Sequence, residues 1–213
     1  MKITNMLKLG ITLAAFATAA CVMLAFVYKA TETRRNDNLN KIQEESLKEI
    51  FENMNIFREL TKEDDVYLPM EKKLIIPDDT DGAVTIEKIF NVWENGEKKA
   101  AFIVSRAGYS GPIRTMVGIS SGGFIIGIRI MEISDTPGLG ANANSPNYYV
   151  DRKNRITFFG QFAGKSIKDP FIVKNDIDAI TASTITSQAV SSSVKAAALI
   201  SGENKWLFTE EEL

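Results

Sequence analysis

A cluster of hydroxyl residues precedes a helix-like run near the C-terminal end of the chain. Ser or Thr occupies positions 181, 183, 184, 186 and 187, directly before the run at residues 188–200. The start of a helix presents unpaired N–H groups and the positive end of the helix dipole, so a phosphate is stabilised there. Thr184 at this place offers a hydroxyl that could carry the phosphate covalently. The same hydroxyls would also serve as an ordinary helix N-cap.

Two glycine-rich segments earlier in the chain have the composition of loops that approach a flat ring. Residues 108–113 read Gly-Tyr-Ser-Gly-Pro-Ile, and residues 135–140 read Asp-Thr-Pro-Gly-Leu-Gly. Glycine lacks a Cβ and adopts positive φ, so its backbone can come close to a planar ligand, while Pro137 stiffens the approach to Gly138. Each segment taken singly is also compatible with an ordinary turn.

These segments resemble, in chain order, the signature segments of one family. Residues 178–184 read Asp-Ala-Ile-Thr-Ala-Ser-Thr. This resembles the flavinylation motif Asp-x-x-(Ser/Thr)-(Gly/Ala)-(Ala/Ser)-Thr in the FMN-binding domain of the G subunit of Rnf complexes and of the C subunit of Na⁺-pumping NADH:quinone reductases. Residues 135–140 resemble the family's Glu-Thr-Pro-Gly-Leu-Gly, with Asp135 in place of Glu. The family commonly has a His just before that segment, where this chain has Ile133 and Ser134. This departure puts in doubt a role for that His in tuning the flavin.

The resemblance implies that FMN is attached to Thr184 by a phosphoester bond. A separate flavin transferase would install it from FAD and would require the motif, including Asp178 and Thr181. Thr181 and Thr186 remain alternative attachment points. The other residues implied in cofactor binding are Ser183, Thr186, Ser187 and Thr181 near the phosphate, and Thr136, Gly138, Leu139 and the backbone of Tyr109 and Gly111 near the ring. A covalent link suits a domain outside the cytoplasm, because a dissociable cofactor would be lost by dilution.

The N-terminal segment is apolar enough to cross a membrane. Residues 9–28 form a run of twenty residues without a charge between Lys8 and Lys29. A helix of that length crosses a hydrocarbon core of about 30 Å. A cleaved signal peptide is the alternative, but the run is longer than the usual apolar region of such a peptide, so we expect an uncleaved anchor. The flanking Lys and Arg do not decide its orientation. The resemblance implies that the flavin domain lies on the extracytoplasmic side of the cell membrane.

The composition excludes most side-chain redox and metal chemistry. The chain of 213 residues has no His, and its single Cys, Cys21, lies inside the apolar run. No His acid–base pair, zinc site of the usual type or iron–sulfur ligand set is therefore available, and we expect neither a catalytic residue nor a metal site. Redox chemistry would require a bound organic cofactor. A net charge of −2 argues against a nucleic-acid partner.

The hydrophobic pattern predicts the elements that position the site. Two β-hairpins are expected, the first at residues 84–93 and 98–107 around Asn95-Gly96, and the second at residues 114–119 and 124–133. A short strand is expected at residues 171–177, and helices are expected at residues 38–54 and 186–201, the last ending near Gly202. Together they predict an α+β fold: one transmembrane helix, then a four-stranded antiparallel sheet with helices packed on one side.

The predicted domains are a tail at residues 1–8, a transmembrane helix at 9–28, a membrane-proximal amphipathic helix with loops at 29–82, and the FMN-binding domain at 83–213. The resemblance implies an electron-relay subunit of a membrane-bound, ion-translocating ferredoxin:NAD⁺ oxidoreductase, the Rnf complex. Turnover would belong to the complex, whose implied partners are the A, D and E membrane subunits and the peripheral B and C subunits. The alternatives are the C subunit of the quinone reductase, which is usually longer, and a flavin-free membrane-tethered assembly or sensory domain.

Overall fold

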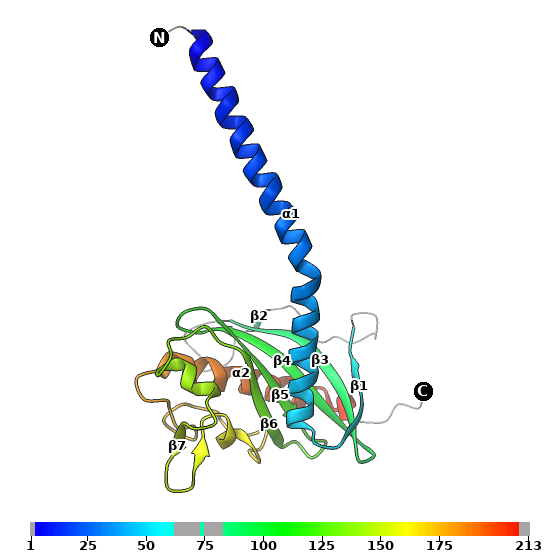
Figure 1. The fold of residues 1–213 in the computed structure, drawn as a ribbon. Helices are drawn as coiled ribbons and strands as arrows, with labels where there is room; N and C mark the ends of the chain where they lie inside the picture. Colours follow the sequence, from blue (N-terminus) through cyan, green and yellow to red (C-terminus); the bar gives the residue numbers. More distant parts are fainter. Residues whose placement is uncertain (1–2, 62–72, 75–82, 209–213) are drawn as a thin grey trace. The chain divides into compact units, whose positions relative to one another are not determined.

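The computed structural model describes residues 3–61, 73–74 and 83–208 (Figure 1). The chain divides into two compact units, Met1–Glu44 and Glu45–Leu213. The first unit is helical, and the second contains the sheet and the remaining helices. An α+β fold with one apolar N-terminal helix is therefore confirmed.

Helix α1 (Ile3–Ile50) is continuous over 48 residues. By length and composition, its described part Met6–Ile50 can cross a membrane. The hydroxyls of Thr12 and Thr18 each donate to a carbonyl four residues earlier, at 2.8 Å, so these polar groups are satisfied within the helix as an apolar surrounding requires. The helix predicted at residues 38–54 is thus the last part of α1, and it ends at Ile50 rather than at 54.

The sheet consists of antiparallel strands in the order β1-β3-β4-β5-β6, with β2 also paired to β3. Their bounds are β1 Met54–Glu59, β2 Lys73–Leu74, β3 Val84–Glu94, β4 Glu97–Ala107, β5 Pro112–Ile119 and β6 Ile125–Glu132. Both predicted hairpins are confirmed. At the first turn, Asn95 has φ 52° and Gly96 has φ 80°, the conformation that an Asn-Gly hairpin turn requires. Strands β1 and β2 were not predicted.

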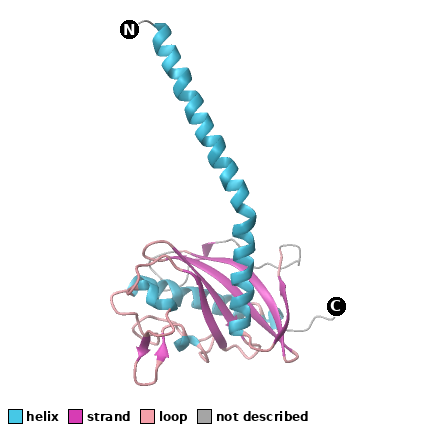
Figure 2. Ribbon diagram, in the orientation of Figure 1, coloured by secondary structure: helices cyan, strands magenta, loops and turns pink. Residues whose placement is uncertain are grey.

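The sheet is covered on both faces, so the prediction of helices on one side only was wrong. One face packs with α2 (Thr184–Glu203), whose buried residues include Val190 and Val194 (Figure 2). The other face packs with Leu47 and Ile50 of the last turn of α1. Gly118 of β5 allows this contact, because a Cβ at this position would lie 2.9 Å from the Phe51 ring.

Short elements connect β6 to α2. They are η1 (Gly140–Asn144), β7 (Tyr149–Asp151), β8 (Ile156–Thr157) and η2 (Gly160–Phe162), and η3 (Lys205–Phe208) follows α2. Helix α2 begins two residues before the predicted start. It continues past Gly202 to Glu203, where the backbone and side-chain amides of Asn204 both donate to Ile200 O, at 3.0 and 2.8 Å.

The strand predicted at residues 171–177 is absent from this described segment, which forms a loop around one carboxylate. Asp176 accepts hydrogen bonds from the amides of Ile172, at 2.6 Å, and Phe171, at 3.2 Å. Phe171 and Lys174 have φ of 51° and 69°. The prediction failed because an Asp side chain that bonds nearby amides competes with strand pairing.

Candidate functional site

The loop that enters α2 is held by side chains from an earlier part of the chain. The side-chain amide of Gln161 accepts from Asp178 N at 2.8 Å and donates to Asp178 O at 3.2 Å. The hydroxyl of Tyr148 accepts from Thr181 N at 3.1 Å. These bonds hold the backbone of the loop, whereas the side chains of Asp178 and Thr181 are exposed.

The first turn of α2 is stabilised from within. Ser187 is buried, and its hydroxyl donates to Ser183 O at 2.9 Å and accepts from Ile180 N at 3.0 Å. Ala182, just before the helix, has φ 58°, a left-handed conformation that costs an L-residue about 1–2 kcal/mol. This is the position where the motif has Gly or Ala, the two residues with the least side chain to accommodate.

One carboxylate joins the three segments that the sequence singled out. Asp135 is 6% exposed. Its Oδ2 accepts from the Thr186 hydroxyl at 2.5 Å, and its Oδ1 accepts from Ser110 N at 2.8 Å. Gly140 closes this contact, because a Cβ there would lie 2.5 Å from Thr186 Oγ1 and 2.6 Å from Asp135 Oδ2. Any side chain at position 140 would therefore overlap with these two groups.

A cavity of about 530 Å³ lies where these segments meet the start of α2. Its lining consists of Tyr109, Asp135, Thr136, Leu139, Gly140, Ala182, Ser183, Thr184, Ile185 and Thr186. Six of the residues implicated by the sequence are in this lining: Tyr109, Thr136, Leu139, Ser183, Thr184 and Thr186. The other four, Gly111, Gly138, Thr181 and Ser187, do not line it.

Four lining residues were not among the predicted contacts. Asp135 and Gly140 lie inside the glycine-rich segment, and Ala182 lies inside the motif. The sequence signal for Asp135 was present, since this residue departs from the family's Glu, but the departure by itself did not indicate which groups bind the carboxylate. No local sequence pattern indicates that Ile185 lines the cavity, because the direction of its side chain depends on where α2 begins.

The first turn of α2 gives the cavity backbone groups that can hold an anion. The N–H groups in the first turn of a helix have no intrahelical partners, and the side chain of the N-cap residue Ser183 does not bond to them. The only charged residue in the lining is Asp135, and each of its carboxylate oxygens already accepts a hydrogen bond. Because α2 begins at Thr184, the positive end of the helix dipole lies at this half-buried residue.

The mouth of the cavity is apolar. Tyr109, Leu139 and Ile185 line it and are 73%, 43% and 51% exposed. A bound ligand can cover such exposed apolar side chains and remove their surface from water. A volume of about 530 Å³ lies within the range of about 300–1,000 Å³ typical of small-molecule sites. The residues present thus fit a planar ligand that carries a phosphate.

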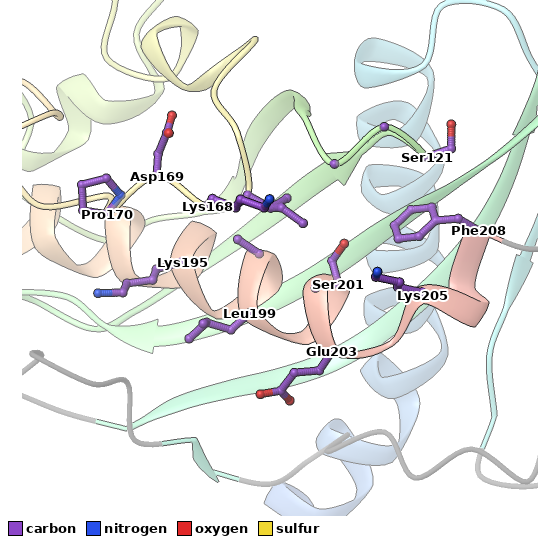
Figure 3. Close-up of a pocket in the computed structure, with 15 residues that line it drawn as sticks. Ser121, Lys168, Asp169, Pro170, Lys195, Leu199, Ser201, Glu203, Lys205 and Phe208 are labelled. Atoms are coloured by element: carbon purple, nitrogen blue, oxygen red, sulfur yellow. The ribbon is translucent and has the colours of Figure 1, made fainter.

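A larger cavity, about 1,040 Å³, lies near the C-terminal end of α2 (Figure 3). The β5–β6 turn, residues 167–170 and the end of α2 line it, and none of the residues implicated by the sequence does so. Figure 3 shows Lys168, Lys195 and Lys205 around it, from three parts of the chain. This cavity has the greater volume of the two, but six of the residues that the sequence singles out line the smaller one.

Two family models match the chain. Residues 108–199 match the model of the FMN-binding domain, and residues 1–50 match that of the RnfG N-terminal region. The G subunit of the ion-translocating oxidoreductase complex of Methanosarcina acetivorans is 30% identical over 188 residues, or 86% of this chain and 87% of that protein.

Two further comparisons cover the chain less closely. The G subunit of the Na(+)-translocating ferredoxin:NAD(+) oxidoreductase complex of Acetobacterium woodii is 41% identical over 96 residues, a match that spans 41% of each protein. A solved structure, the C subunit of the Na(+)-translocating NADH-quinone reductase of Parabacteroides distasonis, is 20% identical, with a TM-score of 0.41 over 74% of this chain and 80% of that one.

The FMN-binding match contains every residue of the smaller cavity. The match to the Methanosarcina acetivorans protein extends over most of both chains. The chain therefore belongs to the G-subunit family of the ion-translocating, Rnf-type oxidoreductase complexes, and it contains that family's FMN-binding domain.

Proposed function

We propose that this chain is the electron-transferring G subunit of an ion-translocating ferredoxin:NAD⁺ oxidoreductase and that it carries FMN esterified to Thr184. The observation that supports this most directly is the cavity at the start of α2, where the motif loop and both glycine-rich segments converge. The family to which the chain belongs supports the wider assignment.

The environment of the three candidate threonines favours Thr184 as the attachment residue. Thr186 is 1% exposed, and its hydroxyl donates to Asp135. Thr181 is exposed and does not line the cavity. Thr184 lines the cavity and is half-buried. Among the residues that the structure describes, its hydroxyl has no hydrogen-bond partner. A transferase would therefore displace no existing contact in esterifying it.

The first turn of α2 would hold the phosphate. A phosphodiester keeps one negative charge, which the unpaired N–H groups and the helix dipole stabilise. Ser183, the helix N-cap, directly precedes the attachment residue, and Thr186 follows it by two residues. The Asp135 carboxylate accepts its hydrogen bonds from the Thr186 hydroxyl and from Ser110 N. It therefore does not occupy the backbone N–H groups of the first turn, which are left for the phosphate.

The apolar mouth would hold the ring. Tyr109, Leu139 and Ile185 expose apolar surface that a flat ring would cover. Bound flavin supplies the uptake and release of electrons, and these residues orient the ring and exclude water from its contact face. The chain's own contribution is thus position, and turnover requires partner subunits that deliver and remove electrons.

The rest of the chain would hold the flavin domain at the membrane. We propose that the apolar part of α1 is the anchor and that the flavin domain is extracytoplasmic. The partners would be the A, D and E membrane subunits and the peripheral B and C subunits, and a flavin transferase would act during maturation. The name of the Acetobacterium woodii relative, which places it in a ferredoxin:NAD(+) oxidoreductase complex, supports the assignment to this class of complex.

In-gel flavin fluorescence tests the attachment. The full-length chain is produced in a host that contains its flavin transferase, denatured, and illuminated in the gel. We expect a fluorescent band and an intact mass raised by that of one FMN less one water, as a phosphoester bond requires. Thr184→Val removes only the hydroxyl at nearly constant shape and should abolish both signals. Thr184→Ser keeps a hydroxyl and is the matched control, in which part of the signal should remain.

The possible contrary results are distinct. Fluorescence in Thr184→Val equal to that of the natural chain would move the linkage, and the mass of the labelled peptide would then show whether Thr181 or Thr186 carries it. An unmodified natural chain in a host with active transferase would contradict the redox function and favour a flavin-free anchored domain.

A further inference from the structure

The β7–β8 hairpin carries cations that the flavin site does not use. Arg152, Lys153 and Arg155 lie in its turn, and all three are exposed. Figure 1 shows the hairpin projecting from the domain at the label β7. The whole chain has a net charge of −2, so this basic turn is a local feature. A local charge cluster on an otherwise near-neutral protein can steer a partner of opposite charge.

The hairpin's one carboxylate is directed into its own turn. Asp151 Oδ1 accepts from the amides of Lys153, at 2.9 Å, and Asn154, at 3.0 Å, and Oδ2 accepts from Asn154 Nδ2 at 2.6 Å. The bond from the Asn154 amide is the main cause that holds the pKa of Asp151 below its usual value. These bonds hold the turn around the Asp151 carboxylate, while the side chains of Arg152, Lys153 and Arg155 are exposed.

Arg155 is held in an orientation that suits binding. It has φ 56°, a left-handed backbone conformation that is costly for an L-residue. Its guanidinium lies 5.5 Å from the centre of the Tyr149 ring, and its Nη2 donates to the Tyr149 hydroxyl at 3.4 Å. A guanidinium restrained in this way loses less freedom when it pairs with a carboxylate.

The base of the hairpin is bonded to the flavin-site loop. Tyr148 directly precedes β7, and its hydroxyl accepts from Thr181 N at 3.1 Å. Thr181 directly precedes Ala182, which lines the flavin cavity. The hydrogen bond from Thr181 N therefore joins the base of the hairpin to the loop that leads into the lining of the cavity.

We propose that the turn of the β7–β8 hairpin docks an acidic face of the protein that exchanges electrons with this chain. Arg and Tyr are the residues enriched at protein interfaces, and Ile156 beside them is 37% exposed. Anionic membranes are recognised by clusters of about 4–8 cations, more than this turn contains. The inference rests on the proposed function, because it assumes that the partner receives or delivers the flavin's electrons.

Charge reversal in the complete complex tests the docking surface. Arg152→Glu combined with Lys153→Glu is compared with Lys168→Glu combined with Lys205→Glu, a matched control of two exposed cations from the larger cavity. In native membranes the hairpin variant should keep its in-gel flavin fluorescence but lose about tenfold in the rate of ferredoxin:NAD⁺ electron transfer at low salt, whereas the control should change less than about twofold. As the salt concentration rises, the electron-transfer rate of the natural chain should fall toward that of the hairpin variant, because salt screens exposed charges.

Equal rates in the two double variants at every salt concentration would overturn the docking inference while leaving the flavin assignment in place. Absence of flavin from the natural chain would instead contradict the proposed function. A crosslinking arm remains readable in that case: Lys153→p-benzoylphenylalanine in native membranes should crosslink to one protein at a peptide rich in Asp and Glu. Crosslinking to phospholipid alone, or to nothing, would exclude an acidic protein partner at this turn.

Discussion

Asp135 is the residue on which the geometry of the site depends most. It lies in a loop between β6 and η1, and its two oxygens accept hydrogen bonds from a second loop and from α2. A carboxylate that is bonded on both oxygens locates these segments more narrowly than apolar contact would, because hydrogen bonds depend on direction. The arrangement leaves no room for a side chain at Gly140.

Gly140→Ala tests this close contact. The added Cβ would overlap with Thr186 Oγ1 and Asp135 Oδ2, and we expect a loss of about 1–3 kcal/mol in the free energy of unfolding together with a lower flavin yield. Gly127→Ala is the control, since no atom lies within 4 Å of the added Cβ. Thermal unfolding of the full chain in detergent measures the difference. Equal melting temperatures for both variants would show that the site tolerates the added methyl group.

At the scale of elements, a hydrogen bond joins the segment after α1 to the β3–β4 hairpin. Glu94, the last residue of β3, accepts from Asn53 N at 2.8 Å and from Lys99 Nζ at 2.6 Å. Asn53 lies between α1 and β1, so this carboxylate joins the connection to the β3–β4 hairpin. Burial raises the pKa of Glu94, but the hydrogen bonds from Lys99 and Asn53 together lower it below its usual 4.5.

Glu94 should make stability depend on pH. Because its pKa is lower in the folded chain than in the unfolded one, its contribution is complete above pH 4.5 and is lost as the pH falls through the folded-state pKa. Between about pH 7 and about pH 4, we expect a larger fall in the free energy of unfolding for the natural chain than for Glu94→Gln. The exposed Glu97→Gln is the control and should follow the natural chain. Parallel pH profiles for Glu94→Gln and the natural chain would contradict this role.

At the scale of the whole molecule, the chain combines an apolar helix with a domain that has its own core on each face of the sheet. The two units have different requirements. The apolar part of α1 satisfies its backbone groups internally, as a membrane demands, while the domain supplies the cavity. This division is consistent with a tethered electron carrier.

The proposed sidedness can be measured with thiol labelling. Lys168→Cys places a thiol at an exposed position of the domain, and Cys21, the only natural thiol, lies inside the apolar segment as an internal control. A membrane-impermeant maleimide should label the introduced cysteine in intact spheroplasts and should leave Cys21 unlabelled, because ionised thiols and aqueous access are both disfavoured in hydrocarbon. Labelling that requires lysis of the cells would place the domain in the cytoplasm.

Local chemistry in the sequence was sufficient for much of this description. The Asn95-Gly96 turn specified the first hairpin, the apolar run predicted the N-terminal helix, and the order of the three segments indicated the family and its FMN-binding domain. These features depend on residues that are close in sequence, where periodicity and turn chemistry act directly. The identity of the attachment residue stays a prediction.

Contacts between distant parts of the chain determined the features that local sequence patterns did not predict. Strand β1 forms because β3 offers an edge to it, and the second helical layer exists because the last turn of α1 meets the sheet beside Gly118. Asp176 turned an expected strand into a loop, and Asp135 became the centre of the site through partners 25 and 51 residues away. Such contacts join distant parts of the chain. Their energies therefore appear only once the chain has folded, which is why the sequence singled out residues that line the cavity but not the hydrogen bonds that bring them together.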